Sequence, residues 1–188
     1  MALRVFVDAN VLFSRTLRDW LFMLRLETGV GVFQLHTTWD VINETGAKLR
    51  DKHSKAPGSL IANLMNKCQE HFDEILEDFP GGPVVSIADE GDWHVHHAAE
   101  ASRADILLTE DAGFDSDGSN YEAYNCDDFF VEVYTSAPDA VKRVVEHQAR
   151  YWAARGGMQL PDALRAARCP KFASAVLGHI KQMALTGK

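Results

Sequence analysis

Short runs of β-branched, aromatic and other apolar residues alternate along this chain with longer stretches whose apolar positions recur at helical spacing. The short runs are residues 3–7, 32–36, 84–87 and 104–108, and we expect each of them to form a strand. Strands that alternate with helices pair in parallel and are covered by helices on both faces. The pattern therefore predicts an α/β fold with a central parallel sheet flanked by helices.

Turn and capping residues bound the helical stretches. We expect helices over residues 11–28, from 39, over 59–79, from 92, and from 127 almost to the end, the last one interrupted near 156–157 and 169–170. A chain of 188 residues with 46% apolar and 24% charged residues has the composition of a single domain that folds alone.

Composition narrows the functional classes. No apolar run is long enough to span a membrane, and the first residues lack the pattern of a signal peptide, so we expect a cytoplasmic protein with no membrane partner. The cysteines Cys68, Cys126 and Cys169 have no CxxC spacing and are expected to be structural. The formal net charge is -8, from 27 Asp and Glu against 19 Lys and Arg. Contact with nucleic acid must therefore be local or must use a metal ion.

Four acidic residues stand where a parallel sheet can bring them together. Asp8 and Asp111 directly follow predicted strands. Glu44 and Asp92 lie on helices that begin soon after strand ends. Because ligands of open parallel sheets lie beyond the carboxyl ends of the strands, these carboxylates could share one crevice. Gathered carboxylates repel one another unless a cation is present, and a ligand set made of oxygen alone suits Mg²⁺ or Mn²⁺.

Each of these acids also has a simpler local explanation. Asp8 or Asp111 alone could be a turn or capping residue, because Asp is favoured in both places. Glu44 alone could be a solvated helix carboxylate, and Asp92 alone a helix N-cap. Only their common placement suggests a metal site.

Two clusters of basic residues are candidates for contacts with RNA phosphates. The first cluster follows Glu44, and the second consists of two arginines one helical turn apart after Asp8. Their members are Lys48, Arg50, Lys52, His53 and Lys55, and then Arg15 and Arg18. The first cluster could equally be a solvated helix end, where cations are favourable without any ligand.

Three histidines, His94, His96 and His97, invite a comparison with zinc sites. On a helix, positions 94 and 97 share a face while 96 points elsewhere, and the chain has no H-E-x-x-H spacing. We therefore expect buried or interfacial histidines rather than zinc ligands.

Four segments resemble PIN-domain ribonucleases in order and spacing. They are V-F-V-D-A-N-V-L at 5–12, V-I-N-E at 41–44, D-W-H-V-H-H-A-A at 92–99 and A-D-I-L-L-T-E-D-A-G-F at 104–114. The likeness is greatest to VapC-type toxins of bacterial toxin–antitoxin systems, covers residues 3–135, and extends to P-K-F-A at 170–173. It implies a PIN-like three-layer fold over residues 1–136, with a helical extension, residues 137–188, packed on the same domain.

The resemblance also implies roles for individual residues. The metal-binding acids would be Asp8, Glu44, Asp92 and Asp111. Asn10 and Thr109 would support them by hydrogen bonds to carboxylates or to water. The VapC branch commonly has Asn at position 111, and the stretch from there to Phe114 is one residue shorter here than usual. Asp115 and Asp117 are therefore alternatives for the last ligand.

The implied activity is endoribonuclease action with Mg²⁺ or Mn²⁺ by a toxin that a cognate antitoxin protein restrains. The apolar helical tail could supply a homodimer face or an antitoxin groove. Two alternatives remain: a catalytically inactive PIN-like binding module, and a haloacid-dehalogenase-like phosphatase. The phosphatase motif D-x-D needs a second Asp as acid and base, and this chain has Asn10 there, an amide that cannot transfer the proton.

Overall fold

The computed structural model describes residues 2–114, 118–154 and 158–186. The chain forms two compact units, one made of Met1–Phe13 and Phe33–Tyr124, the other of Ser14–Val32 and Asn125–Lys188. No helix in the described part of the chain is long and apolar enough to cross a membrane.

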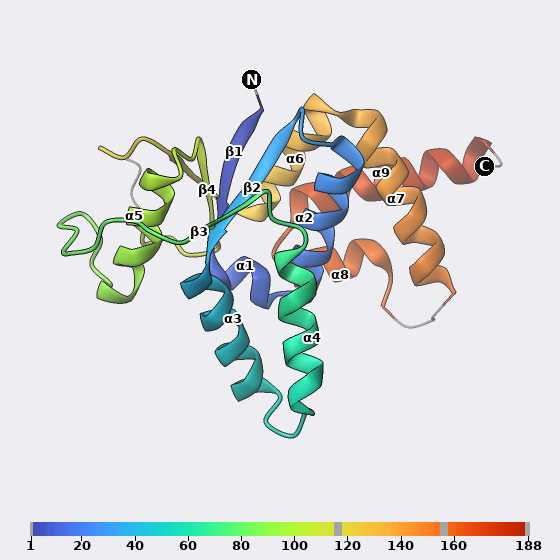
Figure 1. Ribbon diagram of the computed structural model, residues 1–188. Helices are drawn as coiled ribbons and strands as arrows, with labels where there is room; N and C mark the ends of the chain where they lie inside the picture. The colour runs from blue at the N-terminus through green and yellow to red at the C-terminus, as the bar shows by residue number, and fades with distance from the viewer. Residues whose placement is uncertain (1, 115–117, 155–157, 187–188) are drawn as a thin grey trace. The chain divides into compact units, whose positions relative to one another are not determined.

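The first unit is built on a parallel sheet. Within the described residues it has five strands in the order β3-β2-β1-β4-β5, and every neighbouring pair is parallel. The strands are β1 (Leu3–Val7), β2 (Phe33–Thr38), β3 (Glu74–Leu76), β4 (Ile106–Leu108) and β5 (Glu122–Tyr124). Figure 1 shows β1 between β2 and β4. The predicted α/β fold with a central parallel sheet is confirmed.

Strand β1 forms the middle of the core. Val5 pairs with Leu35 of β2 on one side and with Ile106 of β4 on the other. Phe6 and Val7 are fully buried, as a strand covered on both faces requires. The chain leaves this strand at Asp8, so the sheet's central carboxyl end carries an acid.

In the described part of this unit, the α-helices are α1 (Ala9–Phe13), α3 (Trp39–Lys52), α4 (Gly58–Gln69) and α5 (Trp93–Ala101). Helix α3 follows β2 without a loop because the Thr38 side chain accepts a hydrogen bond from the backbone N–H of Val41 at 3.2 Å, which caps the helix. The expectation of a helix from residue 39 after the second strand is confirmed.

The third strand lies elsewhere than the sequence predicted. Residues 84–87 form a turn, in which the Ile87 N–H donates to the Val84 carbonyl at 3.1 Å and Val85 is fully exposed. The strand is β3 instead, because Asp73 fixes this segment to β2: its N–H donates to the Leu35 carbonyl and its carboxylate accepts from the Leu35 N–H, both at 2.8 Å.

Two helix bounds and one strand also differ from expectation. The helix expected over 59–79 ends at Gln69, before β3. The helix expected over 11–28 is divided at Ser14, whose side chain accepts from the Leu17 N–H and caps a new helix. Strand β5 was not predicted, since three partly exposed residues carry too little periodicity to identify a strand.

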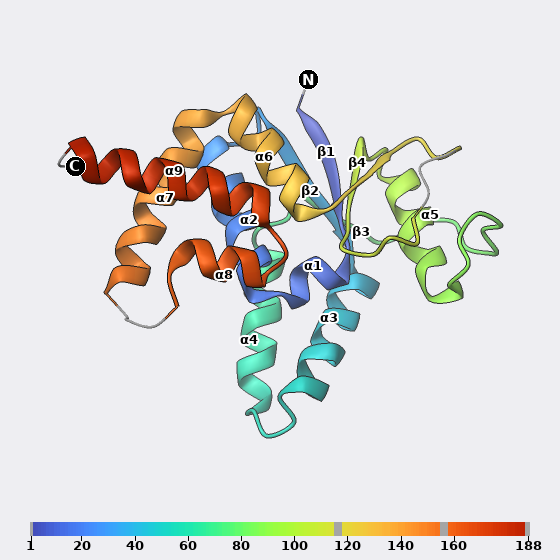
Figure 2. The same ribbon diagram turned by 180° about the vertical axis from the view of Figure 1, so that it is seen from behind.

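The second unit is helical. It contains α2 (Arg15–Thr28), α6 (Cys126–Ser136), α7 (Pro138–Ala153), α8 (Leu160–Ala166) and α9 (Pro170–Thr186). Helix α9 lies against α6, α7 and α8 (Figure 2). In the core of this second unit, the rings of Trp20 and Phe172 pack edge to face, with their centroids 4.9 Å apart.

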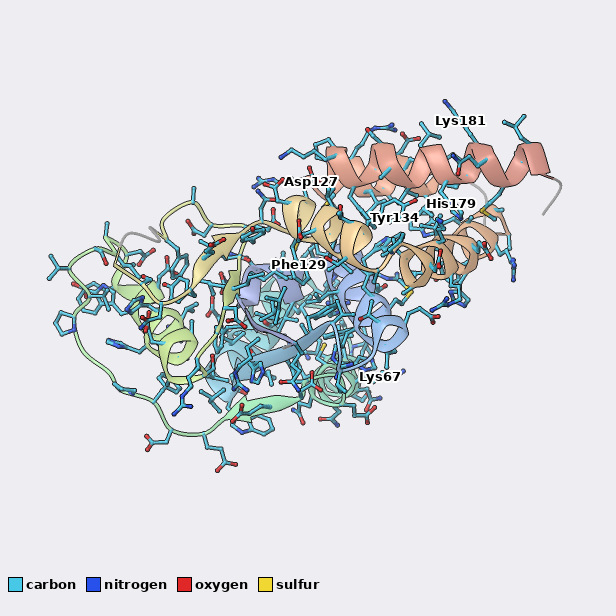
Figure 3. All side chains as sticks on the ribbon, turned by 90° about the horizontal axis from the view of Figure 1, so that it is seen from above. Lys67, Asp127, Phe129, Tyr134, His179 and Lys181 are labelled. Atoms are coloured by element: carbon cyan, nitrogen blue, oxygen red, sulfur yellow. The ribbon has the colours of Figure 1, made fainter. Side chains whose placement is uncertain are left out.

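Asp127 of α6 fixes the start of α9. One of its carboxylate oxygens accepts from the Phe172 N–H at 2.8 Å and the other from the Lys171 N–H at 3.0 Å. Figure 3 labels Asp127 on α6. Because the first N–H groups of a helix have no partner within it, this buried carboxylate satisfies donors that would otherwise be unpaired. The predicted helix interruption at 169–170 is confirmed.

Candidate active site

Asp8 is a buried acid of the candidate site with several hydrogen-bond donors around it. It follows β1 directly and is 6% exposed. One carboxylate oxygen accepts hydrogen bonds from Asn10 Nδ2 and from Thr109 Oγ1, each at 2.7 Å. Burial raises the pKa of Asp8, and the hydrogen bonds from Thr109 and from the Ala9 N–H oppose that rise.

Asn10 and Thr109 join the ends of two neighbouring strands around this acid. Asn10 Nδ2 also donates to Thr109 Oγ1 at 3.0 Å, and Asn10 Oδ1 accepts from the Glu110 N–H at 3.0 Å. Thr109 Oγ1 in turn accepts from the Asp111 N–H at 3.1 Å. The chain beyond β4 is thereby fixed to the chain beyond β1, and Asp8 is held in one orientation.

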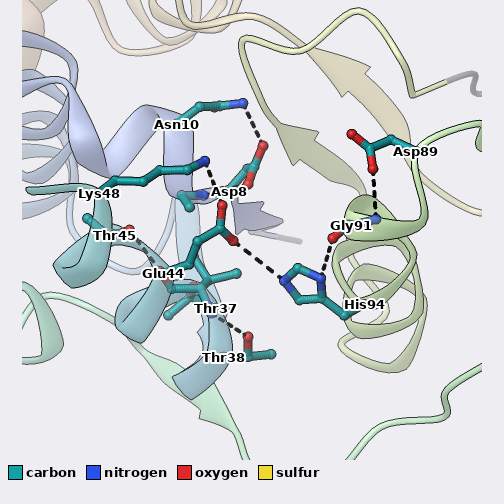
Figure 4. Close-up of polar contacts among 12 residues, drawn as sticks. Asp8, Asn10, Thr37, Thr38, Glu44, Thr45, Lys48, Asp89, Gly91 and His94 are labelled. Carbon is teal, nitrogen blue, oxygen red and sulfur yellow. Dashed lines mark hydrogen bonds and ion pairs between the residues drawn. The ribbon is translucent and has the colours of Figure 1, made fainter. Parts of the chain in front are cut away.

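Glu44 projects from α3 and is held from two sides (Figure 4). Lys48, one turn further along the helix, places its Nζ 2.6 Å from Glu44 Oε1. His94 of α5 places its Nε2 3.8 Å from Glu44 Oε2. Both carboxylate oxygens therefore face a nitrogen.

Asp92 shows how closely the acids are gathered. It ends a short 3₁₀ turn directly before α5. Its pKa is raised to about 6, first by burial and then by four neighbouring negative charges, those of Asp111, Asp8, Asp89 and Glu44. The charges of all three other predicted ligands thus act on this carboxylate.

A glycine lies between two of these acids. The Gly113 N–H donates to Asp111 Oδ1 at 2.8 Å. A Cβ atom at position 113 would lie 3.2 Å from that oxygen and 4.0 Å from Asp92 Oδ2. Asp111 and Asp92 therefore both border the space beside this glycine. Asp115 and Asp117, the alternatives for the last ligand, lie outside the described residues.

The predicted basic residues are placed differently from one another. Lys48 lies at the acidic group, because its Nζ pairs with Glu44 Oε1. Arg50 donates to the Ala56 carbonyl at 2.6 Å, and Lys52 Nζ lies 4.7 Å from the centre of the Phe13 ring. These two therefore face the far end of α3 and its neighbours.

The second predicted basic patch belongs to the other unit. Arg15 pairs with Asp19 at 3.5 Å on α2. Arg18 is 5% exposed, and its Nε lies 3.9 Å from Asp19. Of this pair, only Arg15 presents its guanidinium to solvent.

His94 contacts the site, whereas the sequence predicted only a buried or interfacial histidine at this position. Its Nδ1 lies 2.7 Å from the Gly91 carbonyl, which can only accept, so Nδ1 carries a proton and Nε2 faces Glu44. The other two histidines contact separate groups, Tyr121 for His96 and the Gly82 carbonyl for His97. The spacing D-x-H in one helical turn is the signal that could have linked His94 to Asp92.

The donor chemistry of the site fits Mg²⁺ or Mn²⁺. Its acids supply oxygen ligands. Asp92 resists ionisation because it is partly buried and because negative charges surround it, and a divalent cation would relieve that repulsion. As the described side chains stand, no group of three His, Cys, Asp or Glu residues could hold an ion. Glu44, paired with Lys48, would have to exchange that partner for the ion.

Three comparisons relate the chain to known proteins. A family model described as PIN domain matches residues 4–113, more than half of the chain. The crystal structure of PAE2754 from Pyrobaculum aerophilum is similar in fold, with a TM-score of 0.52 and 20% sequence identity over 72% of this chain and 98% of that one. No curated protein matches. The chain belongs to the PIN domain family, whose members are generally nucleases.

Proposed function

We propose that this protein is a metal-dependent endoribonuclease that hydrolyses phosphodiester bonds in RNA. The observation that carries the proposal is the gathering of four acids: Asp111 and Asp92 border the same glycine, and the charges of Asp8, Glu44 and Asp111 all act on Asp92. Such a concentration of negative charge is unfavourable by itself and is typical of sites that use a cation. Membership of a family of nucleases supports the same reading.

The residues of the site have distinct tasks in this proposal. A bound Mg²⁺ or Mn²⁺ would supply a nucleophilic water near neutral pH and positive charge for the leaving oxygen. Asp8, Glu44, Asp92 and Asp111 would hold the ion. Asn10 and Thr109 keep Asp8 oriented, so that its carboxylate already has a fixed position before the ion binds. The expected products carry 5′-phosphate and 3′-hydroxyl ends.

The central test is cleavage of a panel of labelled structured RNAs by the wild type, Asp8→Asn and Asp51→Asn. Asp51 is an exposed acid at the end of α3 and gives the same charge change away from the site. Loss of an acid that holds the ion should reduce the rate by about a hundredfold or more, and chelator should abolish cleavage. Asp51→Asn should cleave like the wild type. Equal rates for Asp8→Asn and the wild type would refute the proposal.

We further propose that the nuclease is the toxin of a toxin–antitoxin pair and acts in the cytoplasm. Its partners would be RNA, a cognate antitoxin protein and a second copy of the chain. Support comes from the order and spacing of the four segments that resemble VapC-type toxins. Expression in bacteria should then arrest growth, and the same Asp8→Asn substitution should remove the arrest.

The geometry around Asn10 counts against the phosphatase alternative. Its amide donates to Asp8 and to Thr109 and accepts from the Glu110 N–H. An amide with its groups engaged in this way has no proton to give to a leaving group. An inactive binding module would bind RNA without cleaving it in the assay above.

A further inference from the structure

We propose that Lys48 acts as a tethered cation, which neutralises the acidic site when no divalent ion is bound and lowers the affinity with which the ion binds. This inference rests on the metal site of the proposed function. It concerns a residue of the chain itself and its contact with Glu44.

The geometry of α3 brings this cation to the site. Lys48 follows Glu44 by four residues, the spacing at which helical side chains meet, with the acid on the amino-terminal side as the favourable order requires. Their charged atoms are 2.6 Å apart. The Lys48 side chain keeps half of its exposure, so its ammonium group can move into solvent without being stranded in the interior.

The partner of Lys48 links two elements of the site. Glu44 Oε1 faces Lys48 Nζ, while Glu44 Oε2 faces Nε2 of His94 on α5, the helix that directly follows Asp92 (Figure 4). The positive charge of Lys48 therefore lies at the acid that joins α3 to the Asp92 side of the site.

Other cations of the same helix do not share this role. Arg50 is bound to the Ala56 carbonyl, and Lys52 lies over the Phe13 ring. The placement of Lys48 is therefore a property of position 48 and not of a generally basic helix.

Competition follows from the contact with Glu44. A divalent ion that takes Glu44 as a ligand must displace the ammonium group, and the two cations repel each other at short range. By linkage, whatever Lys48 adds to the stability of the ion-free protein is subtracted from the binding of the ion. The site should therefore fill at a higher concentration of free divalent ion than the acids alone would require.

Titration calorimetry of the full chain with Mn²⁺ tests this directly. Lys48→Gln should bind Mn²⁺ about tenfold more tightly than the wild type, because the competing charge is gone. Lys48→Arg, which keeps the charge, should stay within about twofold of the wild type. Lys67→Gln, an exposed lysine of α4, controls for the change in net charge and should also stay within about twofold.

Thermal unfolding supplies a second readout that does not depend on catalysis. In EDTA, Lys48→Gln should unfold at a lower temperature than Lys67→Gln, and saturating Mn²⁺ should remove the difference. If the wild type cleaves RNA with Mn²⁺ but Lys48→Gln binds Mn²⁺ no more tightly than Lys67→Gln does, the inference about Lys48 is refuted and the proposed function is not. A wild type that neither binds Mn²⁺ nor cleaves RNA would overturn the proposed function as well.

Discussion

Asp8 and Asp92 carry the same functional group, and burial is the largest cause of a raised pKa in both. For Asp8, hydrogen bonds from Thr109 and from the Ala9 N–H oppose the rise. For Asp92, four neighbouring negative charges add to the rise, and its pKa reaches about 6. Hydrogen bonds thus favour the ionised form of Asp8, whereas the neighbouring charges disfavour the ionised form of Asp92.

The raised pKa of Asp92 predicts a pH-dependent stability in the absence of divalent ions. Because the folded-state pKa lies above the ordinary value of 3.8, the folded protein loses stability as the pH rises from about 4 through about 6. Asp92→Asn should remove this loss. Solvent screening at a partly exposed carboxylate limits the gain to about 1 kcal/mol, or about 2–4 °C in Tm for a domain of this size.

Scanning calorimetry in EDTA at pH 7.5 and at pH 3.5 checks this prediction. The variant should be the more stable protein at the higher pH and equal to the wild type at the lower pH, while its RNA cleavage is lost. A gain of the same size at both pH values would show that the cause is not the charge of Asp92. Such a combination of higher stability and lost activity is typical of residues retained for function.

At the level of elements, a helix or strand was predictable from the sequence where a long apolar run or a capping side chain marks it, and was not predictable where the strand is short and at the edge of the sheet. Strand β1 and helix α3 were predictable because an apolar run and a capping Thr38 mark them. Strand β3 was not, because it is three residues long and depends on Asp73 contacting Leu35, a partner 38 positions away. Local periodicity carries no information about such a contact.

The candidate site follows the same division. Asp8 and Asp111 could be placed at strand ends from the sequence, since the apolar runs before them are clear. Asp92 was expected soon after a strand, yet a loop precedes it, and its approach to Asp111 depends on tertiary structure. The contact of His94 with Glu44 joins two helices and had no sequence signal beyond the D-x-H spacing.

The Asp127 cap gives a prediction for the second unit. Asp127→Ala leaves the buried Phe172 N–H and the partly buried Lys171 N–H without their partner and should lower the free energy of unfolding by about 2 kcal/mol. The adjacent Asp128 is a matched control, because it makes an exposed ion pair with Lys171. Asp128→Ala should lose less than about 1 kcal/mol in urea denaturation. Equal losses would refute the capping role.

For the whole molecule, an excess of acids limits how RNA can be held. With a net charge of -8, attraction to a polyanion must come from a local group of cations. Lys48, Arg50 and Lys52 lie on the helix that also carries Glu44. The consequence is an affinity that depends on few phosphate contacts.

Binding of RNA should therefore depend only modestly on salt and respond to single lysines. In an Asp8→Asn background that prevents cleavage, Lys52→Gln should weaken RNA affinity about two- to fivefold and reduce the salt slope by about 1. Fluorescence anisotropy over a range of salt concentrations measures both quantities. Lys67→Gln on α4 serves as the control, and an equal effect of both substitutions would mean that α3 is not the RNA-binding element.

A substitution at Gly113 can affect the cleavage step without changing any charge in the site. A methyl group there would press on Asp111 at 3.2 Å and border Asp92, while the acids and basic residues themselves stay unchanged. Gly113→Ala should therefore impair RNA cleavage by a steric effect alone and leave RNA binding in place. An inactive variant of this kind would be suitable for isolating the natural RNA targets of the nuclease in uncleaved form.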